Sequence, residues 1–214
     1  TTLNGREQAT TSSYTESLRW MSFDQYPAEL ISQAAVYKTP KASHIEGGVA
    51  ATPPSAEQFC IEKAVLERLE RYRQEGRSII AVGTTSLRTL ESLYWLAIKI
   101  KQTPEIDINE INLLQWDAYT LEDQQTSINE AMQFLKGWMI QKKLNALIAT
   151  TQLMVKPGYQ FKVCKGLITN FHQPKSTLLL IIAAIAGNEW KTVYQHALAN
   201  DYRFLSYGDG CLFW

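Results

Sequence analysis

The chain has 214 residues, of which 45% are hydrophobic and 11% aromatic, and its formal net charge is zero. This length and composition allow a sizeable buried core in one domain, or in one domain with a small appendage. The neutral balance argues against a protein coated for nucleic acid, and the longest apolar run, residues 178–187, is too short to span a bilayer.

Charge is unevenly distributed along the chain. Residues 1–135 hold 12 Lys and Arg against 18 Asp and Glu, whereas residues 136–203 hold 9 against 2. A basic face built from the second half would suit phosphates. A solvated lysine surface is the alternative interpretation of the same pattern.

The N-terminus and the cysteines bear on the cellular compartment. Residues 1–20 are polar and rich in Thr and Ser, so we expect them to be mobile, and they lack the apolar stretch of a signal peptide. Cys60, Cys164 and Cys211 are odd in number, scattered and without metal-ligand spacing, so we expect free thiols and no metal. We therefore expect a cytoplasmic protein with no membrane partner.

The first elements follow a Pro- and Gly-containing stretch. Residues 34–54 contain several prolines and two adjacent glycines without a sustained period, which is typical of a loop. Ser55 stands three residues before Gln58 in a capping-box arrangement, and apolar residues follow at helical spacing. We therefore predict a helix from Ser55 to its end at Gly76.

A strand, a tight turn and a helix come next. The apolar run SIIAV at 78–82 indicates a buried strand, and the pattern LRTLESLYWLAIKI at 87–100 indicates a helix. Thr84, Thr85 and Ser86 lie between them, where free helix amides and hydroxyls can bind an anion or sugar hydroxyls. An ordinary Thr/Ser helix cap is the alternative.

The second half continues the alternation. Residues 128–144 have helical periodicity, with Met132, Leu135, Met139 and Ile140 on one side, and residues 146–155 are typical of a strand. A turn at 156–159 leads into one or two further strands up to Phe171. The pattern as a whole predicts an α/β fold, a mixed sheet with helices packed on it.

A second junction between a strand and a helix lies in the stretch GLITNFHQPKSTLLLII, residues 166–182. Asn170 and His172 end a strand, Lys175 precedes the next helix, and Ser176 and Thr177 lie where free helix amides point outward. We expect a last helix over residues 189–200 and a terminal strand with a sharp bend at 208–210.

Three segments carry a family resemblance: IIAVGTTSLRTLES, PGYQFKVCKGLITNFHQPKSTLLL and YRFLSYGD. They closely resemble segments of the S-adenosylmethionine:tRNA ribosyltransferase-isomerase family of queuosine biosynthesis. FDQYPAELISQ at 23–33 is similar to the family's N-terminal segment, and KASHIEG at 41–47 and AEQF at 56–59 are weaker matches.

The resemblance also implies a domain arrangement. Family members carry a β-barrel domain inserted after the N-terminal segment, and only a few residues stand at that place here. We expect an α/β main domain over residues 21–214, with the inserted barrel largely absent and residues 34–54 a loop or remnant at the insertion point.

The resemblance implies a reaction and its partners. Family members transfer and isomerise the ribosyl moiety of S-adenosylmethionine onto 7-aminomethyl-7-deazaguanine in tRNA, giving epoxyqueuosine, adenine and methionine. S-adenosylmethionine is then the ribosyl-donating co-substrate, the anticodon arm of tRNA is the partner, and we expect a monomer or weak oligomer. The chemistry needs a base, an acid for departing adenine, and donors for a carboxylate and ribose hydroxyls.

The junction residues fit these roles. For catalysis we name His172, Lys175 and Asp209. For binding S-adenosylmethionine we name residues with a hydroxyl, amide or guanidinium group: Thr84, Thr85, Ser86, Arg88, Asn170, Ser176, Thr177 and Tyr207.

Each assignment has a structural alternative. His172 can be a hydrogen-bonding residue at a strand end, and Arg88 can pair with Glu91 three residues on. The Trp and Tyr residues are expected in the core rather than as base-stacking platforms. A truncated, non-catalytic paralogue that binds S-adenosylmethionine or tRNA, and a plain scaffold, are the alternatives to an enzyme.

Overall fold

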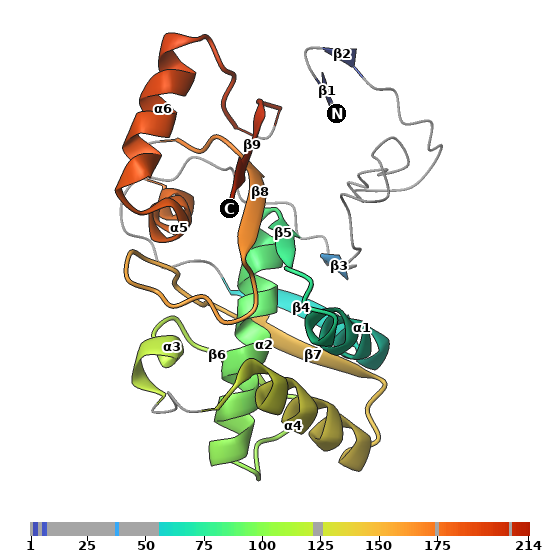
Figure 1. Cartoon of the computed structure of the whole chain (residues 1–214). Coiled ribbons are helices and arrows are strands. Elements are labelled where there is room, and N and C mark those ends of the chain that lie inside the picture. Colours follow the sequence, from blue (N-terminus) through green and yellow to red (C-terminus); the bar gives the residue numbers. More distant parts are fainter. Residues whose placement is uncertain are drawn as a thin grey trace.

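The computed structural model describes residues 2–3, 6–7, 37–38, 56–121, 126–173, 176–205 and 207–214. In this part of the chain, helices pack on a four-stranded and a three-stranded sheet (Figure 1). A separate antiparallel pair joins β1 (Thr2–Leu3) to β2 (Arg6–Glu7). The predicted class, α/β with mixed sheets and packed helices, is confirmed.

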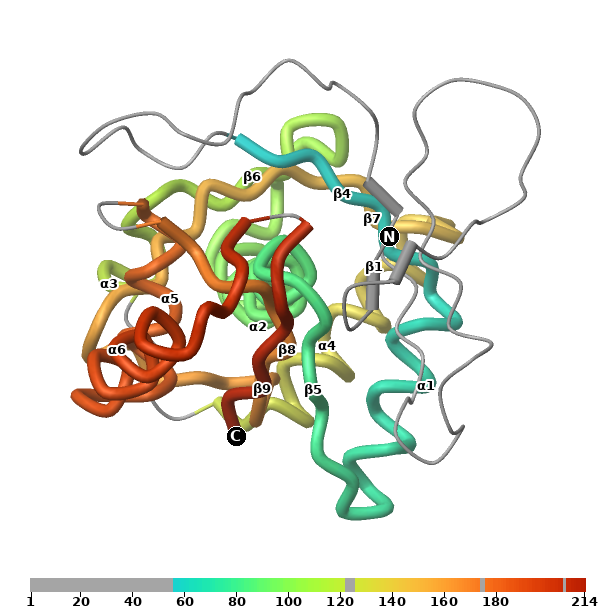
Figure 2. The backbone as a smooth tube through the Cα atoms, turned by 90° about the horizontal axis from the view of Figure 1, so that it is seen from above, coloured from blue at the N-terminus to red at the C-terminus, as the bar shows by residue number. Residues whose placement is uncertain are grey.

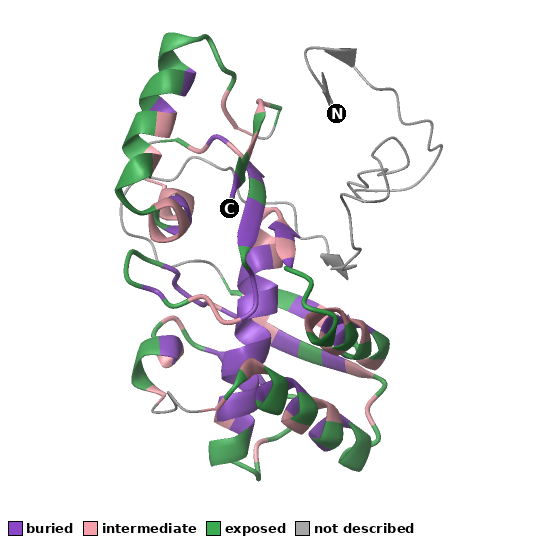
Figure 3. Ribbon diagram, in the orientation of Figure 1, coloured by how far each residue is buried: buried purple, intermediate pink, exposed green. Residues whose placement is uncertain are grey.

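One long helix, α2 (Thr84–Gln102), occupies the centre of the molecule. Apolar side chains recur on all of its faces, and every residue from Leu87 to Ile98 is buried (Figure 3). The helix contacts strands of both sheets as well as α4 (Ile128–Gln141), and Figure 2 shows it end-on between them. Two charged residues of this helix, Arg88 and Glu91, therefore lie in the interior.

The larger sheet has the order β3-β4-β7-β6. Its long strands, β4 (Glu57–Glu62) and β7 (Ala146–Thr151), pair antiparallel over six residues. β6 (Asn112–Leu113) pairs parallel with β7, and β3 (Tyr37–Lys38) pairs antiparallel with β4.

The helix predicted from Ser55 is wrong in its first part. Residues 57–62 form β4, and α1 (Lys63–Gln74) begins only after them. Phe59 and Ile61 alternate into the core while their backbone completes the ladder with β7, a long-range pairing that local periodicity does not reveal. The predicted end near Gly76 is confirmed, because Gly76 adopts a φ of 73° directly after the helix.

The smaller sheet has the order β5-β8-β9. β5 (Ile80–Val82) runs parallel to β8 (Gly166–Asn170), with Val82 opposite Ile168. β9 (Gly210–Phe213) pairs antiparallel with the other edge of β8. Because β5 and β8 are parallel, both of their carboxyl ends lie at the same edge of the sheet.

The remaining helices surround this framework. α1 and α4 pack side by side, and α4 begins with a capping box in which Ser127 accepts from the Glu130 amide and Glu130 accepts from the Ser127 amide. The short helix α3 (Asp117–Thr120) follows β6. α5 (Thr177–Ala186), the 3-10 helix η2 (Gly187–Glu189) and α6 (Trp190–Ala199) form one consecutive group.

Three further sequence predictions need correction. Ile140 is 56% exposed, because the position after Met139 turns away from the buried stripe of α4. Residues 152–155 do not continue β7, although the amides of Gln152 and Met154 still donate to the carbonyls of Leu113 and Gln115. Trp116 and Tyr119 lie at the surface rather than in the core.

Some predictions fall on other parts of the chain. Apart from the short strands β1 to β3, residues 1–20 and 34–54 lie outside the described residues, so their assignment as a mobile segment and a loop remains a prediction. Within the described ranges, no helix has both the length and the apolar character that crossing a membrane requires.

Candidate functional site

The two junctions predicted from sequence lie side by side. The amide of Gly83, at the end of β5, donates to the carbonyl of Ile168 in β8 at 2.8 Å. Gly83 has a φ of 90°, a conformation that favours glycine, and it precedes α2 without a side-chain cap. The hydroxyls of Thr84, Thr85 and Ser86 therefore belong to the first turn of α2 and do not cap it.

Arg88 is one turn further into α2 and is only 5% exposed. Its Nη1 lies 3.6 Å from Oε1 of Glu57, the first residue of β4. Burial lowers the pKa of the Arg88 guanidinium, and the negative charge of Glu57 opposes that shift. The other oxygen of Glu57, Oε2, is buried and has no hydrogen-bond partner among the described residues.

Glu91 is not the partner of Arg88, contrary to the structural alternative considered from the sequence. It accepts hydrogen bonds from the hydroxyl of Tyr159 and from the amides of the loop between β7 and β8, at Lys162, Val163 and Cys164. This carboxylate therefore fixes the loop to α2. Burial raises the pKa of Glu91, and the four hydrogen bonds oppose the shift.

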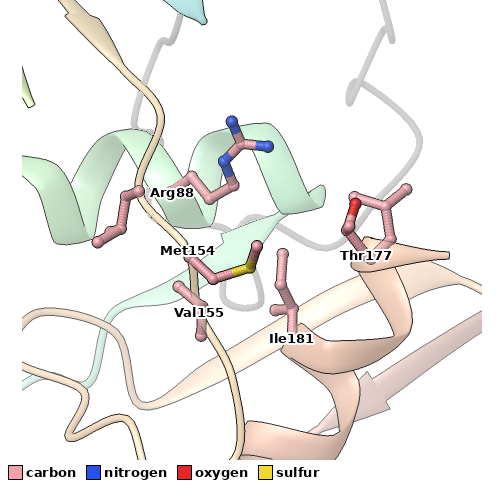
Figure 4. Close-up of a pocket in the computed structure, with 7 residues that line it drawn as sticks. Arg88, Met154, Val155, Thr177 and Ile181 are labelled. Atoms are coloured by element: carbon pink, nitrogen blue, oxygen red, sulfur yellow. The ribbon is translucent and has the colours of Figure 1, made fainter. Parts of the chain in front are cut away.

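A small pocket lies beside Arg88, with a space of about 10 Å³ that admits about one water molecule. Three segments form it: α2, the extended stretch after β7, and α5 (Figure 4). Its lining residues are Arg88, Leu153, Met154, Val155, Thr177, Leu178 and Ile181. It thus offers one buried cation and one hydroxyl among apolar side chains, a composition typical of a small-molecule site.

His172 lies two residues beyond the end of β8. Its Nε2 is 3.0 Å from the hydroxyl of Thr169, and its amide donates to the hydroxyl of Tyr194 in α6. Phe171 packs edge-on against the Tyr194 ring, with the centroids 5.3 Å apart. Both the ring and the backbone of His172 are therefore held in place.

Asn170 and Asp209 meet at the bend before β9. Asn170 Nδ2 donates to the carbonyl of Gly208 at 3.0 Å, while Asp209 accepts from the amide of Arg203 at 2.8 Å. A Cβ at Gly208 would lie 2.3 Å from the Arg203 carbonyl oxygen, so the close turn requires glycine. The hydrogen bond from the Arg203 amide lowers the pKa of Asp209.

The other predicted residues divide between the pocket and the surface. Ser176 caps α5 by accepting from the Leu178 amide at 3.1 Å, and only Thr177 of this pair lines the pocket. Tyr207 is 71% exposed. Lys175 lies outside the described residues.

The structure thus brings Arg88 and Thr177 to one pocket, and it places Asn170 and His172 at the neighbouring strand end. Sequence reasoning missed Glu57 and Thr169, the side chains that contact Arg88 and His172. Glu57 lies in AEQF, one of the weaker matching segments, and nothing in the local pattern marks Thr169. Metal-ligating side chains do not gather in groups of three or more among the described residues.

Comparison with known proteins supports the family. A family model described as "Queuosine biosynthesis protein" matches residues 38–213. The S-adenosylmethionine:tRNA ribosyltransferase-isomerase of Polynucleobacter asymbioticus is 37% identical over 72% of this chain and 30% of its own length. That of Burkholderia orbicola is 29% identical over 90% of this chain and 46% of its own length.

A solved structure is also similar. The S-adenosylmethionine tRNA ribosyltransferase of Thermotoga maritima is 29% identical, with a TM-score of 0.48, over 73% of this chain and 40% of that one. The chain thus spans between 30% and 46% of the length of these relatives. Since the family model covers most of its residues, the chain belongs to the queuosine biosynthesis protein family.

Proposed function

We propose that this chain is a tRNA-modifying transferase-isomerase that uses S-adenosylmethionine as ribosyl donor and 7-aminomethyl-7-deazaguanine in tRNA as acceptor. The products are epoxyqueuosine in the tRNA, adenine and methionine. The observation that carries the proposal is a pocket with a buried arginine, beside two adjoining strand-to-helix junctions, in a chain of this family.

The pocket suits one end of the donor. The space in the pocket, about 10 Å³, admits about one water-sized group, so only the carboxylate of the donor is assigned to it, with Arg88 as the partner group. Met154 and Val155 would contact the apolar methionine chain, and Thr177 would donate to an oxygen. Thr84, Thr85, Ser86 and Ser176 are proposed to serve the ribose hydroxyls from the adjoining helix starts.

Proton transfer is assigned to His172. The sulfonium group makes the neighbouring 5′ carbon of the donor acidic, and departing adenine needs a proton. An imidazole exchanges protons near neutral pH, and Thr169 holds this ring in a fixed orientation. Asp209, which accepts from the Arg203 amide, and Lys175 remain proposed catalytic groups, and Asn170 and Tyr207 remain proposed binding groups.

Adenine release from S-adenosylmethionine, measured with tRNA that carries the deazaguanine base, tests the proposal. We expect release by the unaltered chain and a fall in kcat of about 10²- to 10⁴-fold for His172→Gln. Arg88→Lys should mainly raise KM for the donor, by about tenfold or more, because a lysine loses the planar two-pronged contact. His196→Gln, on the exposed side of α6, is the matched control and should leave both constants unchanged.

Two outcomes would contradict parts of the proposal. Normal turnover by His172→Gln would remove the catalytic role of that residue. If the unaltered chain binds S-adenosylmethionine but releases no adenine, its function is that of a binding module and not of an enzyme.

A further inference from the structure

A surface lined by aromatic rings and lysines lies on and beside α3. Trp116 is 48% exposed and Tyr119 39%, and their ring centroids are 5.8 Å apart. The Nζ atom of Lys156 lies over both, 5.7 Å from the Trp116 centroid and 5.2 Å from that of Tyr119. Exposed rings of this size offer a flat face to a further stacking partner.

The loop that carries the lysines is rigidly supported. Figure 1 shows the loop from β7 to β8 passing beside α3. Buried Glu91 accepts hydrogen bonds from three amides and a hydroxyl of this loop, at residues 159, 162, 163 and 164, and the Tyr159 ring lies 6.2 Å from that of Tyr119. A platform whose side chains are already ordered loses little conformational entropy when it binds.

The positive charge of this surface comes from the loop, because residues 103–127, which include α3, hold six acidic residues and no Lys or Arg. The loop segment KPGYQFKVCK, residues 156–165, carries three lysines and no acidic residue. A second lysine of the loop, Lys162, lies 5.2 Å from the Tyr94 centroid and 5.7 Å from that of Trp95. Both of these rings are buried, so Lys162 adds a cation to the surface and no stacking ring. In α3 itself, the carboxylate of Asp117 pairs with Lys99 at 2.8 Å. One exposed pair of rings, Trp116 and Tyr119, beside two lysines matches the bases and phosphates of unpaired RNA.

The surface also adjoins the pocket. The Tyr119 hydroxyl donates to the carbonyl of Met154 at 3.0 Å, and Lys156 directly follows Val155. Met154 and Val155 both line the pocket next to Arg88. A polynucleotide whose modified base lay beside the donor held at the pocket would place its neighbouring nucleotides within reach of α3.

We infer that Trp116, Tyr119 and Lys156, supported by Lys162, contact unpaired nucleotides next to the modified base in the RNA substrate. Trp116 and Tyr119 stack on bases, and the lysines contact phosphates. The inference rests on the proposed function and specifies which surface of the chain receives the acceptor.

The test measures binding of a fluorescently labelled RNA stem–loop by anisotropy, with a blunt RNA duplex of the same stem as the comparison. Stacking on one aromatic ring is worth about 1–3 kcal/mol per base, so Trp116→Ala should weaken stem–loop binding by about 5-fold to 150-fold. Binding of the duplex, whose bases are covered, should change little. Lys156→Gln should lower the slope of log K against log salt by about 0.7 to 0.9.

Two control variants separate stacking from loss of structure. Trp214→Ala removes a tryptophan that is 76% exposed elsewhere, and it should leave binding unchanged. Tyr119→Phe keeps the ring and loses the hydrogen bond to Met154, so it should bind RNA better than Tyr119→Ala. Urea unfolding checks that each variant is folded.

Several outcomes would overturn the inference: no RNA binding by the unaltered chain, equal affinities of Trp116→Ala and Trp214→Ala, or duplex binding that falls as much as stem–loop binding. Adenine release distinguishes it from the proposed function. If the chain releases adenine but Trp116→Ala binds RNA as tightly as the unaltered chain, the proposed role of this surface is wrong and the proposed function stands. If Trp116→Ala weakens RNA binding but the unaltered chain releases no adenine, the RNA-binding role of this surface stands and the proposed enzymatic function is wrong.

Discussion

Glu91 is a buried carboxylate that joins the central helix to the loop between β7 and β8. Three backbone amides and the Tyr159 hydroxyl donate to it, and Tyr159 in turn accepts from the indole N–H of Trp95 at 2.8 Å. One residue therefore orders the segment that carries Lys156 and Lys162, and with it one flank of the pocket.

Glu91→Gln tests this role. An amide presents one acceptor and one donor group where the loop needs two acceptors, so part of the buried donor set is left unpaired. We expect a loss of about 2–4 kcal/mol in the free energy of unfolding, measured by urea denaturation at neutral pH. Glu75→Gln is the matched control, because its ion pairs with Arg71 and Arg77 are exposed and worth little.

The pH dependence of the free energy of unfolding, compared between the unaltered chain and Glu91→Gln, gives a second readout. Burial raises the pKa of Glu91, so the folded chain binds a proton more readily than the unfolded chain between the ordinary carboxyl pKa and the raised value. The Glu91 contribution to stability therefore falls as pH rises through this window. Glu91→Gln should lack that fall, and identical pH profiles for the two proteins would contradict the raised pKa.

At the scale of one element, α4 shows how a local signal fixes a helix start. Ser127 and Glu130 cap the helix reciprocally, as the helical pattern beginning at Ile128 allows. Ser127→Ala should lower the free energy of unfolding by about 1 kcal/mol, because the Glu130 amide loses its acceptor. Ser127→Asn restores an acceptor and should recover most of that stability in the same urea experiment.

β4 shows the opposite case. The capping-box arrangement after Ser55 and the later apolar spacing predict a helix through residues 57–62, yet these residues are a strand. The six-residue ladder with β7 and the burial of Phe59 and Ile61 outweigh a local preference of the order of tenths of a kcal/mol per residue. That strand places Glu57 next to Arg88.

For the whole molecule, stability depends on the enclosure of α2 by both sheets and α4. Leu96 is fully buried at the middle of this helix, so Leu96→Ala should cost about 3–5 kcal/mol, since the removed side chain leaves a cavity. Leu198→Ala, at an exposed position of α6, should change stability by less than about 0.5 kcal/mol. Similar losses for the two variants, measured by thermal or urea unfolding, would contradict the central place of α2.

The sequence by itself determined the features that have local or segmental causes. Apolar periodicity specified α2 and α4, short apolar runs indicated β5 and β8, and glycine marked the end of α1. The same patterns placed hydroxyls and His172 at two strand-to-helix junctions. The matching segments then indicated the family, which the family model confirms.

Only the tertiary structure decided how these pieces meet. It paired Arg88 with Glu57 instead of Glu91, assigned Glu91 to the loop, and left Trp116 at the surface. These contacts join residues far apart in the chain, and their free energies depend on burial and on which donors and acceptors are brought together. Neither quantity is encoded in local spacing, because each arises only when α2 is enclosed by strands and helices from both halves of the chain.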